Sequence, residues 1–199
     1  MSIEMPDVLY HGTNTKVLNL MTKSTGFINK NYWLGEKDFG PAFYTTSSYK
    51  QAKKFARRNA KLDENQYSNP CVLRFKCRRI EIENMDYSIF LGPSLKWAAL
   101  VHEYRIEEKR DQRDIVFGPL ADNKIEGVIS ECKREEKGKE WLYEQIIKGE
   151  DDKNIQDFDD QLVFCNEDIA KQVLTVEGWY TFTKKGGWRY NDSEQAELL

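Results

Sequence analysis

The sequence predicts an α+β protein organised as a single domain. Short apolar segments with strand-like alternation are interspersed irregularly with amphipathic helical segments. The 199 residues are enough to bury a sizeable core within one domain. A composition of 40% hydrophobic and 32% charged residues is typical of a globular chain. We expect the domain to span residues 7–183 and to be followed by a polar C-terminal tail over residues 184–199.

The first part of the chain combines two short strands with a long connection. Val8–His11 is predicted to be a strand, and residues 14–41 are predicted to be a loop because they contain turn signals at Gly26, Gly35 and Gly40-Pro41. Loops of this length are often functional lids. Ala42–Thr46 reads as the second strand.

A helix follows the second strand, capped by Ser47 or Ser48 and running to about Leu62. One side of this helix is apolar and consists of Ala52, Phe55, Ala56 and Ala60. The other side is basic and consists of Lys50, Lys53, Lys54, Arg57, Arg58 and Lys61. A stripe of this kind is commonly a solvated face, but it is also suited to contact phosphate groups.

The rest of the chain alternates between strands and helices. Periodicity predicts strands over Cys71–Lys76, Asp114–Gly118, Gly127–Ile129, Gln161–Cys165 and Thr175–Thr183. Helices are predicted over Leu95–Glu107, Lys139–Lys148 and Ile169–Leu174, the last with Asn166 as its N-cap. The acidic residues 149–158 are expected to form a surface connection, and Gly118-Pro119 with Asp122-Asn123 either a simple turn or a loop that faces an acceptor.

Composition excludes several classes of protein. The net charge of −3 does not suggest a dedicated nucleic-acid binder, and no apolar run is long enough to span a membrane. The N-terminus lacks the pattern of a secretory signal, so we expect a cytoplasmic protein. The four cysteines form no C-x-x-C pair and only two histidines are present, which argues against a metal site. We expect the cysteines to be unpaired, as small buried hydrophobic residues or idle thiols.

Three motifs stand out as a candidate site. The first is Tyr10-His11-Gly12-Thr13, at the end of a strand. The second is Phe39-Gly40-Pro41-Ala42-Phe43-Tyr44, a glycine turn that leads into an aromatic strand. The third is Asp159-Asp160-Gln161, where polar residues open an apolar strand. We expect an enzyme that acts on NAD if the three motifs meet in one cleft.

These motifs resemble those of the ADP-ribosyltransferase superfamily, in the branch shared by diphtheria toxin and the poly(ADP-ribose) polymerases. The branch has a His-Tyr-Glu triad, and its fold is a split antiparallel β-sandwich with flanking helices. The resemblance implies that His11 binds a ribose hydroxyl, that the backbone beside Gly12 and Thr13 holds the nicotinamide amide, and that Tyr44 stacks on the nicotinamide ring. A second aromatic residue lies eleven positions after the tyrosine in the family, and this position is Phe55 here.

The third motif departs from the family because Gln161 replaces the glutamate of the triad. A glutamine can hold the ribose 2′-hydroxyl but carries no charge to offset the oxocarbenium ion. Asp159 or Asp160 is a candidate source of that charge. By analogy with other members of the superfamily, we hypothesise that Asp159 orients or deprotonates the acceptor. A Gln161→Glu change is predicted to keep or raise activity. Stretches spanning roughly residues 8–175 also resemble a small bacterial group with a His-Tyr-Gln pattern.

The resemblance implies an NAD-dependent mono-ADP-ribosyltransferase that requires no metal. NAD is the co-substrate and the acceptor is a macromolecule, either a protein or a nucleic acid. The stand-alone size favours a bacterial toxin of a toxin–antitoxin or phage-defence system, with a cognate antitoxin as partner. Two alternatives stay open: an NAD glycohydrolase, with water as the acceptor, and an inactive module that binds NAD, ADP-ribose or a partner. His11, Tyr44 and Phe55 also have a plain structural interpretation, as a hydrogen-bonding histidine and core aromatics.

Overall fold

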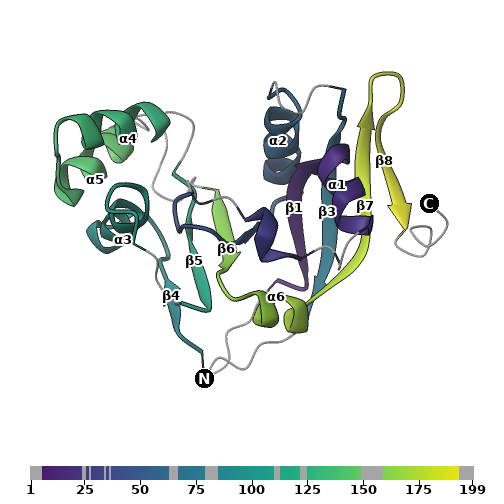
Figure 1. Cartoon of the computed structure of the whole chain (residues 1–199), viewed down its shortest axis with the longest axis horizontal. Helices are drawn as coiled ribbons and strands as arrows, with labels where there is room; N and C mark the ends of the chain where they lie inside the picture. The colour runs from purple at the N-terminus through teal and green to yellow at the C-terminus, as the bar shows by residue number, and fades with distance from the viewer. Residues whose placement is uncertain are drawn as a thin grey trace. The chain divides into compact units, whose positions relative to one another are not determined.

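The computed structural model of the chain confirms the α+β class (Figure 1). The structure describes residues 6–23, 26, 28–33, 35, 37–62, 67–78, 85–109, 113–121, 125–148 and 159–192. The chain divides into two compact units and crosses between them four times along its length. Unit 1 contains residues 1–31, 43–84 and 167–199, and unit 2 contains residues 32–42 and 85–166.

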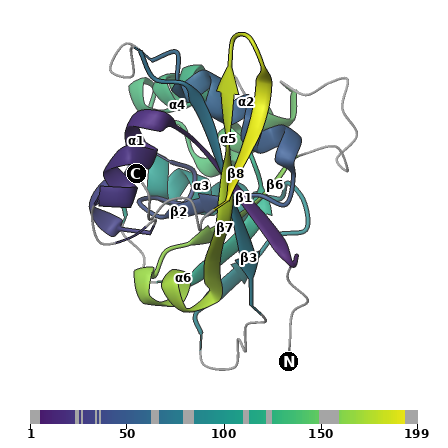
Figure 2. The ribbon, with the colours of Figure 1, turned by 90° about the vertical axis from the view of Figure 1, so that its right-hand side faces the viewer.

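Unit 1 is built around an antiparallel sheet in the order β1-β3-β7-β8. Figure 2 shows the hairpin that β7 and β8 form at one side of this sheet. Its strands are β1 (Val8–Asn14), β3 (Pro70–Cys77), β7 (Leu174–Thr183) and β8 (Gly187–Asp192). The unit also contains α1 (Thr15–Lys23), β2 (Phe43–Thr45), α2 (Tyr49–Asn59) and α6 (Glu167–Val173). A 3₁₀ turn, Lys30–Tyr32, lies where the chain passes into unit 2.

Strand alternation explains the two faces of this sheet. One face packs against α2, where Ala52 and Ala56 are buried against Val72 and the half-buried Tyr10. The intervening residues Leu9, Leu73 and Phe75, which point to the opposite face, are fully buried. The α2 helix begins at Ser48, whose hydroxyl accepts the backbone N–H of Gln51 at 3.2 Å.

Unit 2 contains a second sheet with packed helices. Its strands follow the order β6-β5-β4, with β5 antiparallel to β6 and parallel to β4. The strands are β4 (Tyr87–Ile89), β5 (Ile115–Pro119) and β6 (Asp160–Phe164). The helices are α3 (Leu95–Arg105), α4 (Ile125–Arg134) and α5 (Lys139–Lys148). Trp97 of α3 is fully buried, and its indole N–H donates to the carbonyl of Pro119 at 3.2 Å, which ties α3 to the end of β5.

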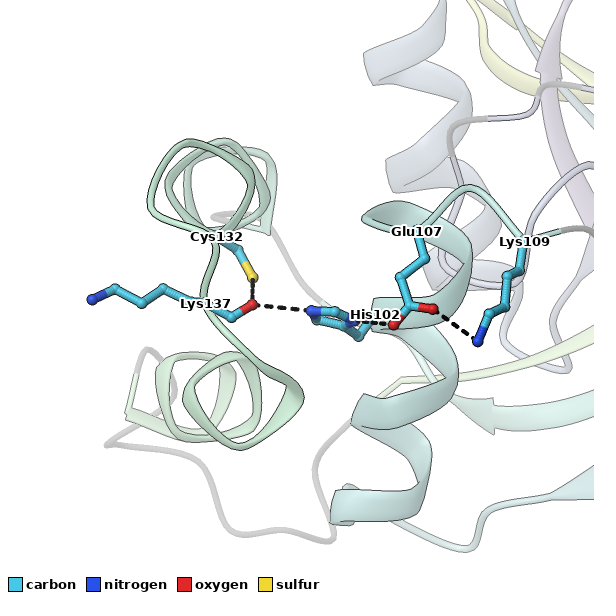
Figure 3. A network of polar contacts seen from close by, with 5 residues as sticks. All are labelled: His102, Glu107, Lys109, Cys132 and Lys137. Atoms are coloured by element: carbon cyan, nitrogen blue, oxygen red, sulfur yellow. Dashed lines mark hydrogen bonds and ion pairs between the residues drawn. The ribbon is translucent and has the colours of Figure 1, made fainter.

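His102 has a structural role in unit 2, where it joins α3 to the turn between α4 and α5 (Figure 3). Its Nε2 lies 3.0 Å from the carbonyl oxygen of Lys137, which also accepts from the thiol of Cys132 at 3.2 Å. Its Nδ1 lies 3.2 Å from Glu107, which in turn pairs with Lys109. These contacts join neighbouring helices.

Three predictions of local structure are wrong, and one strand is absent from the predictions. Residues 14–41 are not a continuous loop, because α1 and the 3₁₀ turn lie within them. Gly127–Ile129 is part of helix α4 rather than a strand. The stretch after residue 183 is not only a polar tail, because its described residues include β8. Strand β4 has no predicted counterpart, and the predictions for residues 149–158 and Asp122-Asn123 lie outside the described residues.

Two further expectations concern cysteines and membranes. All four cysteines are free, and Cys71, Cys77 and Cys132 are buried. Burial raises the pKa of Cys71 to about 12 and that of Cys77 to about 11, so these thiols are poor nucleophiles. The part of the chain that the structure describes contains no helix long and apolar enough to cross a membrane.

Candidate functional site

The first and second motifs meet in unit 1 where β1 and β2 come together. Tyr10 and Thr46 exchange two backbone hydrogen bonds of 2.8 and 2.9 Å. Among the described residues this pair is an isolated bridge, and the pairing does not continue as a ladder. The carbonyl of Tyr44 instead accepts a hydrogen bond from the side chain of His11. The two strands therefore part immediately beside His11 and Gly12.

His11 is held in a single orientation by two contacts within unit 1. Its Nδ1 lies 2.7 Å from the Tyr44 carbonyl oxygen, and its ring stacks on Phe43 with centroids 4.7 Å apart. Burial lowers the pKa of His11, an effect that the Tyr44 hydrogen bond only partly opposes, so the ring is neutral near pH 7. Because a carbonyl only accepts, Nδ1 carries the proton and Nε2 presents a lone pair.

Gly12 lies where α2 crosses closest to β1. A Cβ atom added at Gly12 would be 2.4 Å from the carbonyl oxygen of Ala52 and 3.2 Å from Cβ of Phe55. Only glycine fits this crossing. Since Tyr10 turns its backbone N–H and C=O towards β2, Gly12, two residues later, turns the same groups towards that edge. Among the described residues the pairing with β2 has stopped there, so these groups of the buried Gly12 are not part of a ladder with β2.

The two aromatic residues of the predicted stack lie on the α2 face of β1. The Tyr10–Thr46 bridge fixes the register, and alternation then places Tyr44 on the same face as Tyr10 and Gly12. Phe55 reaches this face from α2, and 40% of its surface is exposed. Phe55 thus shares the β1-facing side of α2 with Ala52 and Ala56, as predicted, but its interpretation as a core aromatic residue is wrong because its side chain is exposed. Thr13 is buried in β1 opposite Cys71.

The third motif lies in unit 2, at the start of β6. Gln161 is only 4% exposed and pairs with Gly118 across the sheet. Its amide nitrogen donates to Asp38 Oδ2 at 3.3 Å and to the carbonyl of Pro119 at 3.5 Å. Asp159 lies one residue before β6 with its side chain exposed, and its carbonyl accepts the N–H of Leu120 at 2.7 Å.

Asp38 is a buried acid that sequence reasoning missed. It is 7% exposed, and its Oδ2 also accepts the N–H of Ala121 at 3.4 Å. Burial raises the pKa of Asp38, which the charge of Arg105 and the hydrogen bond from Gln161 partly oppose. Asp38 is positioned by the turn at Gly40, which has φ +72° and packs against the ring of Tyr104. The signal available in the sequence was an acid immediately before the second motif.

The basic side of α2 is combined with aromatic residues of unit 1. Arg57 lies over the rings of Phe182 and Trp188, 5.1 and 5.8 Å from their centroids, and Lys53 lies 4.4 Å from that of Tyr49. Unit 1 has 17 lysines and arginines against 12 acidic residues, a net charge of +5, whereas unit 2 has 13 against 21, a net charge of −8. The modest charge of the whole chain thus conceals a strongly basic unit.

The structure brings together His11, Gly12, Tyr44 and Phe55 within unit 1, and it brings Gln161 beside Asp38 within unit 2. Among the described residues no group of histidine, cysteine and acidic side chains is arranged to hold a metal ion.

Comparison with protein families gives one match. A family model described as "Protein of unknown function (DUF3990)" matches residues 8–174. The chain belongs to the DUF3990 family. The matched region begins at β1 and extends through α6, so it includes all three motifs of this DUF3990 protein. No curated protein and no solved structure matched the chain. The description of the family names no activity, and the resemblance to ADP-ribosyltransferases stays a prediction.

Proposed function

We propose that this DUF3990 protein is a mono-ADP-ribosyltransferase, which cleaves NAD and transfers ADP-ribose to a macromolecular acceptor. The proposal includes the split β-sandwich fold of that superfamily. The observation that carries it is the interrupted pairing beside His11 and Gly12. The side chain of His11 donates to the Tyr44 carbonyl, and among the described residues the backbone of β1 at Gly12 has no strand partner on the β2 side; we infer that these groups serve as a small polar recognition site.

The chemistry of this surface matches the nicotinamide riboside half of NAD. A carboxamide has one donor group and one acceptor, and the N–H and C=O of Gly12 complement both. Nε2 of the neutral His11 accepts a hydrogen bond from a ribose hydroxyl. The rings of Tyr44 and Phe55, on the same face of β1, stack on the flat pyridinium.

Catalysis on this proposal is a matter of positioning and electrostatics. The N-glycosidic bond between ribose C1′ and the nicotinamide nitrogen breaks, and its electron pair leaves with neutral nicotinamide. The ribose carries the resulting oxocarbenium charge until a nucleophilic atom of the acceptor bonds to C1′ and loses its proton. Gln161 holds the 2′-hydroxyl, and Asp159 orients the acceptor or removes its proton.

Transfer of label tests the proposal directly. NAD labelled in its adenylate half is incubated with the purified protein and cell lysate, and protein and RNA fractions are analysed for label. We expect labelled macromolecules with the unmodified protein, and loss of labelling with His11→Ala and Tyr44→Ala. Tyr67→Ala, at a fully exposed tyrosine, is the matched control and should label normally.

Other results select between the alternatives. Free ADP-ribose without labelled macromolecules would identify an NAD glycohydrolase. Saturable NAD binding with neither product would identify a binding module. If NAD does not bind at all, the proposed function is wrong. The toxin hypothesis adds a separate expectation, namely growth arrest on expression that is relieved by His11→Ala and by a co-expressed cognate antitoxin.

A further inference from the structure

The buried pair of Asp38 and Gln161 in unit 2 has an arrangement that packing alone does not explain. Both side chains are more than nine-tenths buried, and the Gln161 amide nitrogen lies 3.3 Å from Asp38 Oδ2. A carboxylate in such a position is costly unless it is paired or fully hydrogen-bonded. Among the described residues two donors reach Asp38, both at long distances of 3.3 and 3.4 Å, and Arg105, whose charge acts on it, also forms an ion pair with Glu126 at 2.7 Å.

The carboxylate determines which way the amide of Gln161 faces. An ionised carboxylate only accepts hydrogen bonds, and so does the Pro119 carbonyl, the second partner of the amide. Both partners therefore select the NH₂ end of the amide. The amide oxygen, Oε1, must face away from Asp38.

We propose that Asp38 is the positioning residue of Gln161: it fixes the amide so that Oε1 accepts the ribose 2′-hydroxyl, and it supplies the negative charge that the glutamine lacks. The inference rests on the proposed function. Asp38 and Gln161 then divide between them the two tasks of the triad glutamate, because one provides the acceptor oxygen and the other the charge.

Burial favours Asp38 over the two acids beside Gln161 in the sequence. Asp159 and Asp160 are exposed, so water and salt screen their charges. Asp38 is surrounded by protein, where a charge acts more strongly on its neighbours. The orienting effect also requires direct contact with the amide, and the hydrogen bond of 3.3 Å provides it.

The stability of an Asp38→Asn variant separates a functional acid from a structural one. Burial raises the pKa of Asp38, which means that ionising this acid costs more free energy in the folded state than in the unfolded one. The charges that act on it are those of Arg105 and Lys37. Replacing the acid by a neutral amide of the same shape should therefore leave the unfolding temperature at pH 7 unchanged or raised. An acid retained only for stability would give the opposite result.

A cycle of four proteins tests the proposal: the unmodified chain, Asp38→Asn, Gln161→Glu and the double variant. The assay is steady-state NAD cleavage, with unfolding temperatures measured on the same samples. Asp38→Asn should lower kcat about 10- to 100-fold and change the KM for NAD less than about threefold. The reason is that the negative charge lost with Asp38 stabilises the oxocarbenium charge, which develops only in the transition state. Glu140→Gln, at an exposed acid of α5, is the matched control and should be unchanged.

The most informative variant is Gln161→Glu. The family pattern alone predicts that it keeps or raises activity, but here the new carboxylate would lie against Asp38. Two carboxylates at this distance do not both ionise, so we expect the single change to lower both activity and unfolding temperature. In the double variant the amide introduced at position 38 donates to the carboxylate introduced at position 161, and activity should rise above that of either single variant.

The outcomes separate the two proposals. If the unmodified protein does not cleave NAD, the proposed function and this inference both fail. If it does, but Asp38→Asn retains full kcat, or Gln161→Glu alone is as active as the double variant, Asp38 has no positioning role while the proposed function stands. A loss of activity in Asp38→Asn that follows a lower unfolding temperature would likewise overturn the inference in favour of a structural acid.

Discussion

Replacing Gly12 with alanine tests the crossing of β1 and α2 on which the candidate site depends. The added Cβ would be 2.4 Å from the Ala52 carbonyl oxygen and 3.0 Å from the Ala56 nitrogen, both backbone atoms of α2. An ordinary contact begins near 3.4 Å, so α2 or β1 must move by roughly 1 Å, and forced overpacking of this kind costs about 1–3 kcal/mol.

The expected loss is measurable by thermal unfolding. For a chain of this size, 1 kcal/mol shifts the unfolding temperature by about 2–4 °C, so Gly12→Ala should melt about 2–12 °C lower. Gly127→Ala is the matched control, since an added Cβ there meets nothing within 4 Å. Gly127 lies inside helix α4, where alanine is favoured by about 0.5–1 kcal/mol, so this variant should melt higher.

Opposite signs for the two glycines are the critical result. If Gly12→Ala melts at or above the unmodified protein, the close crossing of α2 over β1 is wrong, and the geometry of the edge beside His11 fails with it.

Three further predictions concern unit 1. Folding lowers the pKa of His11, so the contribution of this residue to stability is present above the unfolded pKa of 6.5 and is lost as the pH falls through the folded-state pKa. Between pH 7.5 and 5 the unfolding temperature should therefore fall more steeply for the unmodified protein than for His11→Gln. Parallel curves for the two proteins would contradict this. Tyr44→Ala should weaken NAD binding in calorimetry by about 1–3 kcal/mol while Tyr44→Phe retains it, and equal losses would show that the ring does not stack. If the acceptor is a nucleic acid, Arg57→Ala should weaken the binding of a labelled single-stranded RNA and reduce the slope of log affinity against log salt concentration by about one unit. The control Lys96→Ala, in unit 2, should change neither quantity. Identical anisotropy curves for the two variants would exclude the basic side of α2 as the RNA-binding surface.

Local sequence signals predict much of the fold. The serine cap and the apolar stripe locate helix α2, and periodicity gives α5 with its observed bounds, Lys139–Lys148. Helix α1 escapes prediction because three glycines suggest a loop, although Asn14 accepts the N–H of Val17 as an N-cap does. Gly127 likewise leads to the prediction of a short strand where helix α4 lies. The helical spacing of the buried residues Ile125, Ile129 and Cys132 is the better signal.

The candidate site is predictable only where its residues are close in sequence to a motif. The spacing from Tyr44 to Phe55 follows from a strand, a cap and the first turns of a helix, all of which are local. The contact between Asp38 and Gln161 joins positions 123 residues apart, and no local pattern links them. Nor does the sequence reveal that Gly12 is required by packing, because the closeness of α2 depends on the tertiary structure.

The position of β7 has a practical consequence for expression of this family. The match to DUF3990 ends at residue 174, the first residue of β7, yet β7 lies between β3 and β8 in the sheet. A recombinant fragment trimmed to the family boundary would leave the backbone N–H and C=O groups of Cys71–Cys77 unpaired along one side, beside a hydrophobic face. Exposed strand edges of this kind promote aggregation. Loss of activity in such a fragment would report misassembly of the sheet, and it would say nothing about whether residues 175–199 contribute to the chemistry.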